Sequence, residues 1–158
     1  MDQKFETLSL DSRLIKNLND LDYHAMTPIQ AMSLPLILKG EDIIAQAKTG
    51  SGKTAAFGLG ILNELNIKQT RPQSLILAPT RELAEQVATE LRTLGRTLPN
   101  MKVLTITGGK SEFQQRKSLL HGSHIVVGTP GRVAKLLRKR ILNLEYLKSY
   151  VLDEADRM

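Results

Sequence analysis

The stretch Ala47-Lys48-Thr49-Gly50-Ser51-Gly52-Lys53-Thr54 decides how the rest of the sequence is interpreted. Gly50 and Gly52 allow backbone angles that turn successive N–H groups inward, and a helix starting near Lys53 adds the positive end of its dipole. Lys53 is placed to neutralise the β- and γ-phosphates of a nucleotide, and the Thr54 hydroxyl to bind Mg²⁺. We predict that this stretch binds ATP with Mg²⁺; the alternative is a glycine-rich turn without a ligand.

Short apolar runs, rich in β-branched residues and nearly continuous, recur along the chain. They are Ile43–Ala47, Leu75–Ala78, Val103–Thr107, Ile125–Gly128 and Tyr150–Leu152. Continuous runs of this kind are typical of parallel strands that are covered on both faces. We therefore predict an α/β fold with a mostly parallel sheet and helices on both faces, in which ligands bind at the carboxyl ends of the strands.

Helical patterns lie between these runs. Helix starts are predicted at Thr27-Pro28 with Gln30, at Ser111 with Gln114, and at Thr129-Pro130. Apolar stripes mark one helix at Leu10, Leu14, Leu18 and Leu21, another at Leu83, Val87, Leu91 and Leu94 before Gly95, and a third at Val133, Leu136 and Leu137. Strand and helix thus alternate along the sequence.

An acidic tetrapeptide, Asp153-Glu154-Ala155-Asp156, follows the last apolar run. A carboxylate at the end of a strand, downstream of a phosphate loop, is suited to holding Mg²⁺ through water, and we assign this role to Asp153. Glu154 could orient and deprotonate an attacking water. The tetrapeptide taken alone could also be an acidic helix start.

Positive charge is concentrated in the middle of the chain. Residues 68–140 hold 14 Lys or Arg against 4 Asp or Glu, whereas residues 1–67 hold 6 against 8 and residues 141–158 hold 2 against 4. A basic segment of this kind indicates a polyanionic partner such as nucleic acid, with a solvated basic surface as the alternative.

Composition excludes some classes of protein. There is no cysteine, so disulfides and cysteine-ligated metals are excluded. No apolar stretch approaches the length of a membrane span, and we expect a cytoplasmic protein that acts as a monomer. His24, His121 and His124 do not form a metal-ligand pattern.

Together these motifs resemble those of the DEAD-box RNA helicases, whose name the residues 153–156 spell. The other matching blocks, in chain order, are Phe5 with Tyr23 and Met26–Gln30, the phosphate loop, Pro79–Ala84, Gly108-Gly109 and Thr129–Arg132. Residues 45–60 are most similar to the bacterial DbpA-type branch of that family. Asp22 stands where the family usually has Gly, and Ala47 where the general phosphate-loop pattern has Gly.

The resemblance implies a role for each matching residue. Gln30 would read the adenine edge and Tyr23 would stack on the adenine ring. Lys53, Asp153 and Glu154 would be catalytic, with Thr54 and Asp153 at the Mg²⁺. The RNA partner would be single-stranded or locally unwound, with ribosomal RNA as one candidate. Five residues would contact one RNA strand: Thr80, Arg81, Gly109, Thr129 and Arg132. Such contacts go to phosphates and sugars and do not read the base sequence.

Simpler interpretations remain for several of these residues. Gln30 and Thr27 make sense as a capping box, Thr129-Pro130 as an ordinary helix start, and Arg81 as a solvated side chain. Lys135, Arg138, Lys139 and Arg140 are better explained by a helix C-terminus than by specific RNA binding.

The resemblance also implies how the chain divides. Residues 1–30 would form an N-terminal helix and adenine-recognition segment, and residues 31–158 an incomplete RecA-like helicase ATP-binding domain, truncated before its last strands. The family continues into a Ser-Ala-Thr motif, two more strands and a C-terminal helicase domain that carries the arginine fingers. We therefore expect ATP-dependent RNA unwinding from the intact parent, and slow or absent ATP hydrolysis from this chain alone. The alternatives are a catalytically inactive nucleotide- or RNA-binding fragment, and an ATPase that acts on double-stranded DNA.

Overall fold

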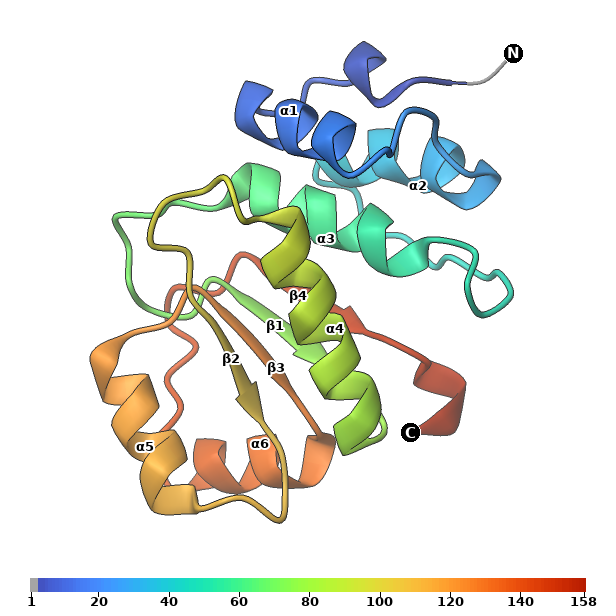
Figure 1. The fold of residues 1–158 in the computed structure, drawn as a ribbon. Coiled ribbons are helices and arrows are strands. Elements are labelled where there is room, and N and C mark those ends of the chain that lie inside the picture. Colours follow the sequence, from blue (N-terminus) through green and yellow to red (C-terminus); the bar gives the residue numbers. More distant parts are fainter. Residues whose placement is uncertain (1–2) are drawn as a thin grey trace. The chain divides into compact units, whose positions relative to one another are not determined.

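A computed structural model describes residues 3–158 (Figure 1). The chain forms two compact units. The first runs as far as Glu64 and takes in Thr93–Pro99, and the second comprises Leu65–Arg92 and Asn100–Met158. No helix within residues 3–158 is long and apolar enough to cross a membrane.

The first unit is helical. It contains a short 3-10 helix, η1 (Phe5–Thr7), and three α-helices, α1 (Ser12–Asp20), α2 (Pro28–Leu38) and α3 (Lys53–Glu64). Leu14 and Leu18 are buried as the apolar stripe predicted, while Leu10 and Leu21 lie just outside α1. The predicted capping box starts α2. The Thr27 hydroxyl accepts the Gln30 N–H at 3.5 Å, and the Gln30 side-chain oxygen accepts the Thr27 N–H at 2.9 Å.

The predicted strand at Ile43–Ala47 is wrong, because this segment has neither strand nor helix structure. Ile44 is fully exposed, with a relative accessibility of 101%. A strand exists only where a neighbouring strand completes its backbone hydrogen bonds, and no strand of the described residues pairs with this segment. The apolar pattern alone therefore does not make it a strand.

The second unit contains a parallel four-stranded sheet, with β1 (Ser74–Leu77), β2 (Val103–Ile106), β3 (Ile125–Gly128) and β4 (Ser149–Leu152). The order across the sheet is β2-β3-β1-β4. In the register, Ile76 of β1 is level with Val127 of β3, which is level with Thr105 of β2. Each strand lies within one residue of a predicted apolar run.

Helices cover both faces of the sheet, as predicted (Figure 1). On one face, side chains of the strands and of α6 (Pro130–Arg138) form a core, which comprises Leu75, Ile106, Val126, Val133, Leu136 and Leu142. Side chains alternate along a strand, so Thr105 faces the other way. Its hydroxyl donates to the Glu85 carboxylate of α4 (Arg81–Leu94) at 3.1 Å, which places α4 on the opposite face.

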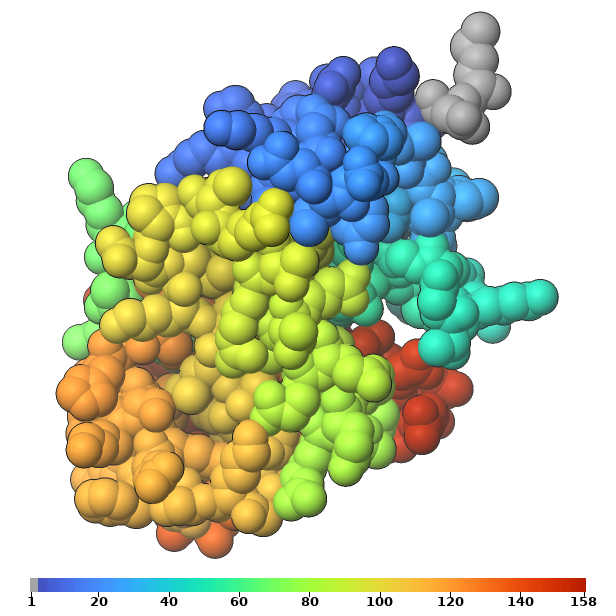
Figure 2. Space-filling view, viewed as in Figure 1, coloured from blue at the N-terminus to red at the C-terminus, as the bar shows by residue number. Residues whose placement is uncertain are grey.

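Of the remaining helices of the second unit, α5 (Glu112–His121) connects β2 to β3 and η2 (Ala155–Arg157) follows β4. Ser111 caps α5 by accepting the Gln114 N–H at 3.3 Å. Both α4 and α5 reach the surface on the face shown in Figure 2. Parallel strands place all four carboxyl ends at one edge of the sheet, which we call the carboxyl edge, and the predicted RNA-contacting residues follow these ends.

Candidate nucleotide and nucleic-acid interface

The phosphate loop lies in the first unit and directly precedes α3. Gly50 and Gly52 have positive φ angles of 78° and 93°, the region that favours glycine. Lys53 begins α3, and its ammonium group donates to the carbonyl oxygen of Ala47. The Ser51 hydroxyl is buried without a hydrogen-bond partner among the described residues. Loop curvature, the helix start and an unsatisfied buried hydroxyl all fit a loop that receives phosphate oxygens.

Gln30 joins the start of α2 to the phosphate loop. This side chain is 6% exposed, and its amide nitrogen donates to the Gly52 carbonyl oxygen at 3.1 Å. A Cβ atom at Gly52 would collide with that amide, so glycine is needed there for space as well as for its backbone angle. Tyr23 is 45% exposed in the same unit. Adenine recognition by these two residues stays a prediction.

Thr80 and Arg81 follow β1, and Thr129 follows β3, at the carboxyl edge. Thr80 caps α4, since its hydroxyl accepts the Leu83 N–H at 3.2 Å. Arg81 is the first residue of α4 and is exposed. Thr129 precedes α6 without a side-chain cap, and its N–H donates to the Ile106 carbonyl oxygen at 3.0 Å.

The loop between β2 and α5, Thr107–Ser111, is held by side chains from three helices. Arg81 of α4 donates to the Gly108 carbonyl oxygen at 3.1 Å. Gln115 of α5 donates to the Thr107 carbonyl oxygen at 2.9 Å. Arg132 of α6 donates to the Lys110 carbonyl oxygen at 3.0 Å. The structure therefore brings Arg81, Gly109 and Arg132 together around what we call the β2–α5 loop.

Gly109 has no room for a side chain at the centre of this loop. Its φ angle is 77°, and a Cβ atom there would overlap the guanidinium group of Arg81. Lys110, next in the chain, is tied to the Glu85 carboxylate at 2.5 Å. That contact, together with the Thr105 hydroxyl, holds the pKa of Glu85 below its ordinary value despite some burial. The loop is thus tied to α4 on both sides of Gly109.

Gln115 is a site residue that the sequence did not reveal. It is 4% exposed. Its side-chain oxygen accepts a hydrogen bond from the Arg132 guanidinium group at 2.9 Å, and its side-chain nitrogen donates to the Thr107 carbonyl oxygen. A polar residue on a helix gives no sign of being buried unless its partners on other elements are known. The only available signal is its position four residues after the Ser111 cap, which places it one turn into α5.

The acidic motif follows β4 at the carboxyl edge. Asp153 is 8% exposed, and its N–H donates to the Leu77 carbonyl oxygen at 2.9 Å. Glu154 adopts the left-handed backbone region with φ 52°, which is unusual for a residue with a side chain. Burial and, secondly, the Asp153 carboxylate raise the pKa of Glu90. Glu90 of α4 therefore lies close enough to Asp153 for the two carboxyl groups to interact.

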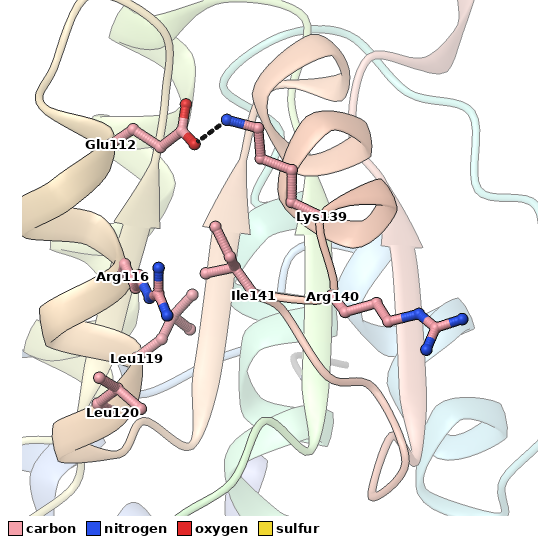
Figure 3. Close-up of a pocket in the computed structure, with 7 residues that line it drawn as sticks. All are labelled: Glu112, Arg116, Leu119, Leu120, Lys139, Arg140 and Ile141. Carbon is pink, nitrogen blue, oxygen red and sulfur yellow. Dashed lines mark hydrogen bonds and ion pairs between the residues drawn. The ribbon is translucent and has the colours of Figure 1, made fainter.

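One cavity of about 410 Å³ in the second unit lies apart from all predicted site residues (Figure 3). Its lining comprises Glu112, Arg116, Leu119, Leu120, Lys139, Arg140 and Ile141. Figure 3 shows the Lys139 ammonium bonded to the Glu112 carboxylate and the Arg140 side chain directed away from the other lining residues. The cavity thus lies between α5 and the end of α6. Its basic side chains do not point towards one common ligand position.

Comparisons with known proteins agree with this fold. A DEAD box protein from the hyperthermophile Methanococcus jannaschii superposes with a TM-score of 0.93 at 40% identity, over 98% of this chain and 42% of that one. Dbp5 of S. cerevisiae bound to RNA and ADP BeF3 superposes with a TM-score of 0.89 at 34% identity, over 99% and 39% of the two chains.

Curated relatives are similar over nearly the whole of this chain. The ATP-dependent RNA helicase DbpA of Escherichia coli K12 is 54% identical over 155 residues, which cover 98% of this chain and 34% of the relative. The helicase CshA of Listeria monocytogenes is 44% identical over 98% of this chain and 30% of the relative. The chain spans about a third of the length of these relatives.

The parallel sheet with helices on both faces defines an α/β domain of the RecA-like fold class. The family model "DEAD/DEAH box helicase" matches residues 27–158. The chain belongs to the DEAD/DEAH box helicase family, which confirms the resemblance found in the sequence.

Proposed function

We propose that this chain supplies the ATP-binding motifs and the first RNA-contacting surface of an ATP-dependent RNA helicase. The observation that carries the proposal is the β2–α5 loop at the carboxyl edge, where Arg81 and Arg132 are fixed beside Gly109. Two guanidinium groups held from different helices can contact successive phosphates of one strand without reading its bases. Thr80 and Thr129 follow neighbouring strands of the same sheet edge and would add hydroxyl or backbone contacts.

The first unit would bind the nucleotide. N–H groups of the loop 47–54 and the Lys53 ammonium group would hold the phosphates, while Gln30 and Tyr23 would hold the adenine. The buried Ser51 hydroxyl, which has no partner among the described residues, supports this assignment because a phosphate oxygen would satisfy it.

Mg²⁺ would be held by the Thr54 hydroxyl and, through water, by Asp153. The ion would neutralise charge on the β- and γ-phosphates. Glu154 would accept a proton from the attacking water. The burial of Asp153 at the end of β4 and the left-handed backbone of Glu154 support these roles.

Further properties of the parent protein belong to the same proposal. Its RNA would be single-stranded or locally unwound, with ribosomal RNA as one candidate, and it would act as a cytoplasmic monomer. Residues 1–30 would form the adenine-recognition segment, and residues 31–158 the start of the helicase ATP-binding domain.

The substitution Glu154→Gln in the parent protein tests the catalytic part of the proposal. It retains the size of the side chain and removes its ability to accept a proton. We expect RNA-stimulated phosphate release to fall by at least about 100-fold, the usual contribution of a general base. Nucleotide affinity, measured with a fluorescent ATP analogue in the presence of Mg²⁺, should stay within about twofold.

A binding module without catalysis is the second candidate, because the buried Ser51 hydroxyl and the fixed Arg81 and Arg132 side chains suit ligand binding and do not require turnover. The same experiment separates the two functions. If the parent protein shows no phosphate release above the Glu154→Gln background while it still binds nucleotide and RNA, the helicase proposal is wrong and the binding module is correct.

A further inference from the structure

We propose that Gln115 is a positioning residue that holds Arg132 in the orientation needed to contact an RNA phosphate. The inference rests on the proposed function, since it assigns a supporting residue to the RNA contact of Arg132. Gln115 belongs to none of the family motifs found in the sequence. It lies on α5, whereas Arg132 lies on α6.

The geometry uses one end of the Arg132 guanidinium group. Its Nη1 donates to two acceptors, the Gln115 side-chain oxygen at 2.9 Å and the Lys110 carbonyl oxygen at 3.0 Å. These two bonds occupy both hydrogens of Nη1. Nε and Nη2 make no hydrogen bond to the residues that the structure describes. They form the edge of the group that binds a phosphate with two parallel hydrogen bonds.

Gln115 can fix this orientation because it is itself fixed. Its side chain is 4% exposed, and its nitrogen donates to the Thr107 carbonyl oxygen at 2.9 Å. Thr107 begins the β2–α5 loop, two residues before Gly109. One buried amide therefore sets both the start of that loop and the direction of Arg132.

An arginine without such a partner would lose more side-chain entropy on binding a phosphate, because its rotamers would have to be ordered at that moment. With Gln115 in place, much of this ordering is achieved before RNA arrives. Removal of Gln115 is therefore expected to weaken RNA binding only as long as Arg132 is present.

The experiment measures binding of a fluorescein-labelled oligouridine RNA by the 158-residue chain, from anisotropy across a series of salt concentrations. Gln115→Met replaces the amide by an apolar side chain of similar size. Gln114→Met makes the same replacement one residue away, at an exposed position, and serves as the matched control. The series is completed by Arg132→Ala and by the double variant Gln115→Met, Arg132→Ala.

We expect Gln115→Met to weaken RNA binding about three- to tenfold, the effect of one lost hydrogen bond. The slope of log affinity against log salt should become less steep, by up to about 0.7, the contribution of one phosphate contact to single-stranded nucleic acid. The double variant should bind like Arg132→Ala alone, and Gln114→Met like wild type. A purely structural role would lower the melting temperature and leave the salt slope unchanged, and that result overturns the inference.

A second measurement does not depend on RNA. In ¹⁵N NMR spectra, the guanidinium Nε signal of Arg132 should shift towards the position of a solvent-exposed arginine in Gln115→Met. It should stay at its wild-type position in Gln114→Met. An unchanged signal overturns the inference whatever the RNA data show. If the signal changes as expected but wild type does not bind the RNA, the RNA function of Arg132 has failed. The proposed function is then overturned, and the inference with it, because the NMR result shows that Gln115 orients Arg132 but the RNA contact is absent.

Discussion

At the scale of single residues, buried polar side chains join segments that are distant in the sequence. Asn17 of α1 donates to the carbonyl oxygens of Thr93 and Leu94 at 2.9 and 2.8 Å, within the first unit. In the second unit, His124 is 1% exposed and lies between two backbone segments. Each of these side chains satisfies backbone groups that are buried or partly buried.

His124 uses both ring nitrogens. Nδ1 accepts the Lys102 N–H at 3.0 Å, so Nε2 carries the proton and donates to the Ile67 carbonyl oxygen at 2.8 Å. We expect His124→Leu to lower the free energy of unfolding by about 1–3 kcal/mol, because two partly buried backbone groups lose their hydrogen-bond partners. Urea denaturation followed by circular dichroism measures this change.

His121→Leu is the control for that measurement. It alters an exposed histidine at the end of α5 and should change the free energy of unfolding by less than about 0.5 kcal/mol. Equal effects of the two substitutions would show that the hydrogen bonds of His124 are not what stabilises this region.

At the scale of elements, α5 and α6 are linked through one carboxylate. Glu112 in the first turn of α5 receives hydrogen bonds from Lys139 at 2.6 Å and from Lys135 at 3.0 Å. These bonds lower the pKa of Glu112 from its ordinary value of 4.5 to about 2. The four basic residues near the end of α6 were predicted to complement the helix C-terminus. Lys135 and Arg138 do lie in the last turn of α6, and Lys135 and Lys139 also bond the Glu112 carboxylate.

The lowered pKa predicts how stability depends on pH. A carboxyl group whose pKa is lower in the folded state than in the unfolded state stabilises the protein at pH values above its unfolded-state pKa. This stabilisation is lost as the pH falls through its folded-state pKa. We expect the melting temperature of wild type to exceed that of Glu112→Gln near neutral pH. The difference should shrink as the pH falls from 4.5 towards about 2.

Glu82→Gln is the matched control, because Glu82 occupies the first turn of α4 as Glu112 does in α5. It forms no ion pair within residues 3–158. The melting-temperature difference for Glu82→Gln should vary less with pH over the same range. A pH profile of Glu112→Gln that parallels that of Glu82→Gln would show that the two lysines do not hold the carboxylate in solution.

At the scale of the whole molecule, the candidate residues divide between the two units. The phosphate loop, Gln30 and Tyr23 belong to the first unit, whereas the carboxyl edge and the acidic motif belong to the second. The residues proposed to bind the adenine and phosphates and those proposed to contact RNA can therefore be substituted separately.

We expect the 158-residue chain to bind ATP with Mg²⁺ but to show little RNA-stimulated turnover. The physical reason is electrostatic, because arginine fingers contribute roughly 10³–10⁵-fold to phosphoryl transfer and the resemblance assigns them to a further helicase domain. Phosphate release measured with and without oligouridine RNA provides the test. Turnover equal to that of the parent protein would contradict this expectation. As a control, Lys53→Ala should abolish nucleotide binding in the 158-residue chain and in the parent protein.

Much of the fold could be predicted from local patterns. The four paired strands lie within one residue of the predicted runs, and the capping box at Thr27 and Gln30 has the expected bonds. Such features depend on residues a few positions apart, so the sequence displays them directly. The segment Ile43–Ala47 could not be assigned in this way, because its pattern is that of a strand but no described strand pairs with it.

The sequence by itself determined the family, the motifs and the alternation of strand and helix, because each of these is written in residues that are close together along the chain. Only the tertiary structure decided which side chains hold the site. Gln115 meets Arg132 and Thr107, and His124 meets Lys102 and Ile67, through contacts between different elements. A polar side chain is stable in a buried position only where the fold supplies its partners, and those partners are known only once the chain is folded.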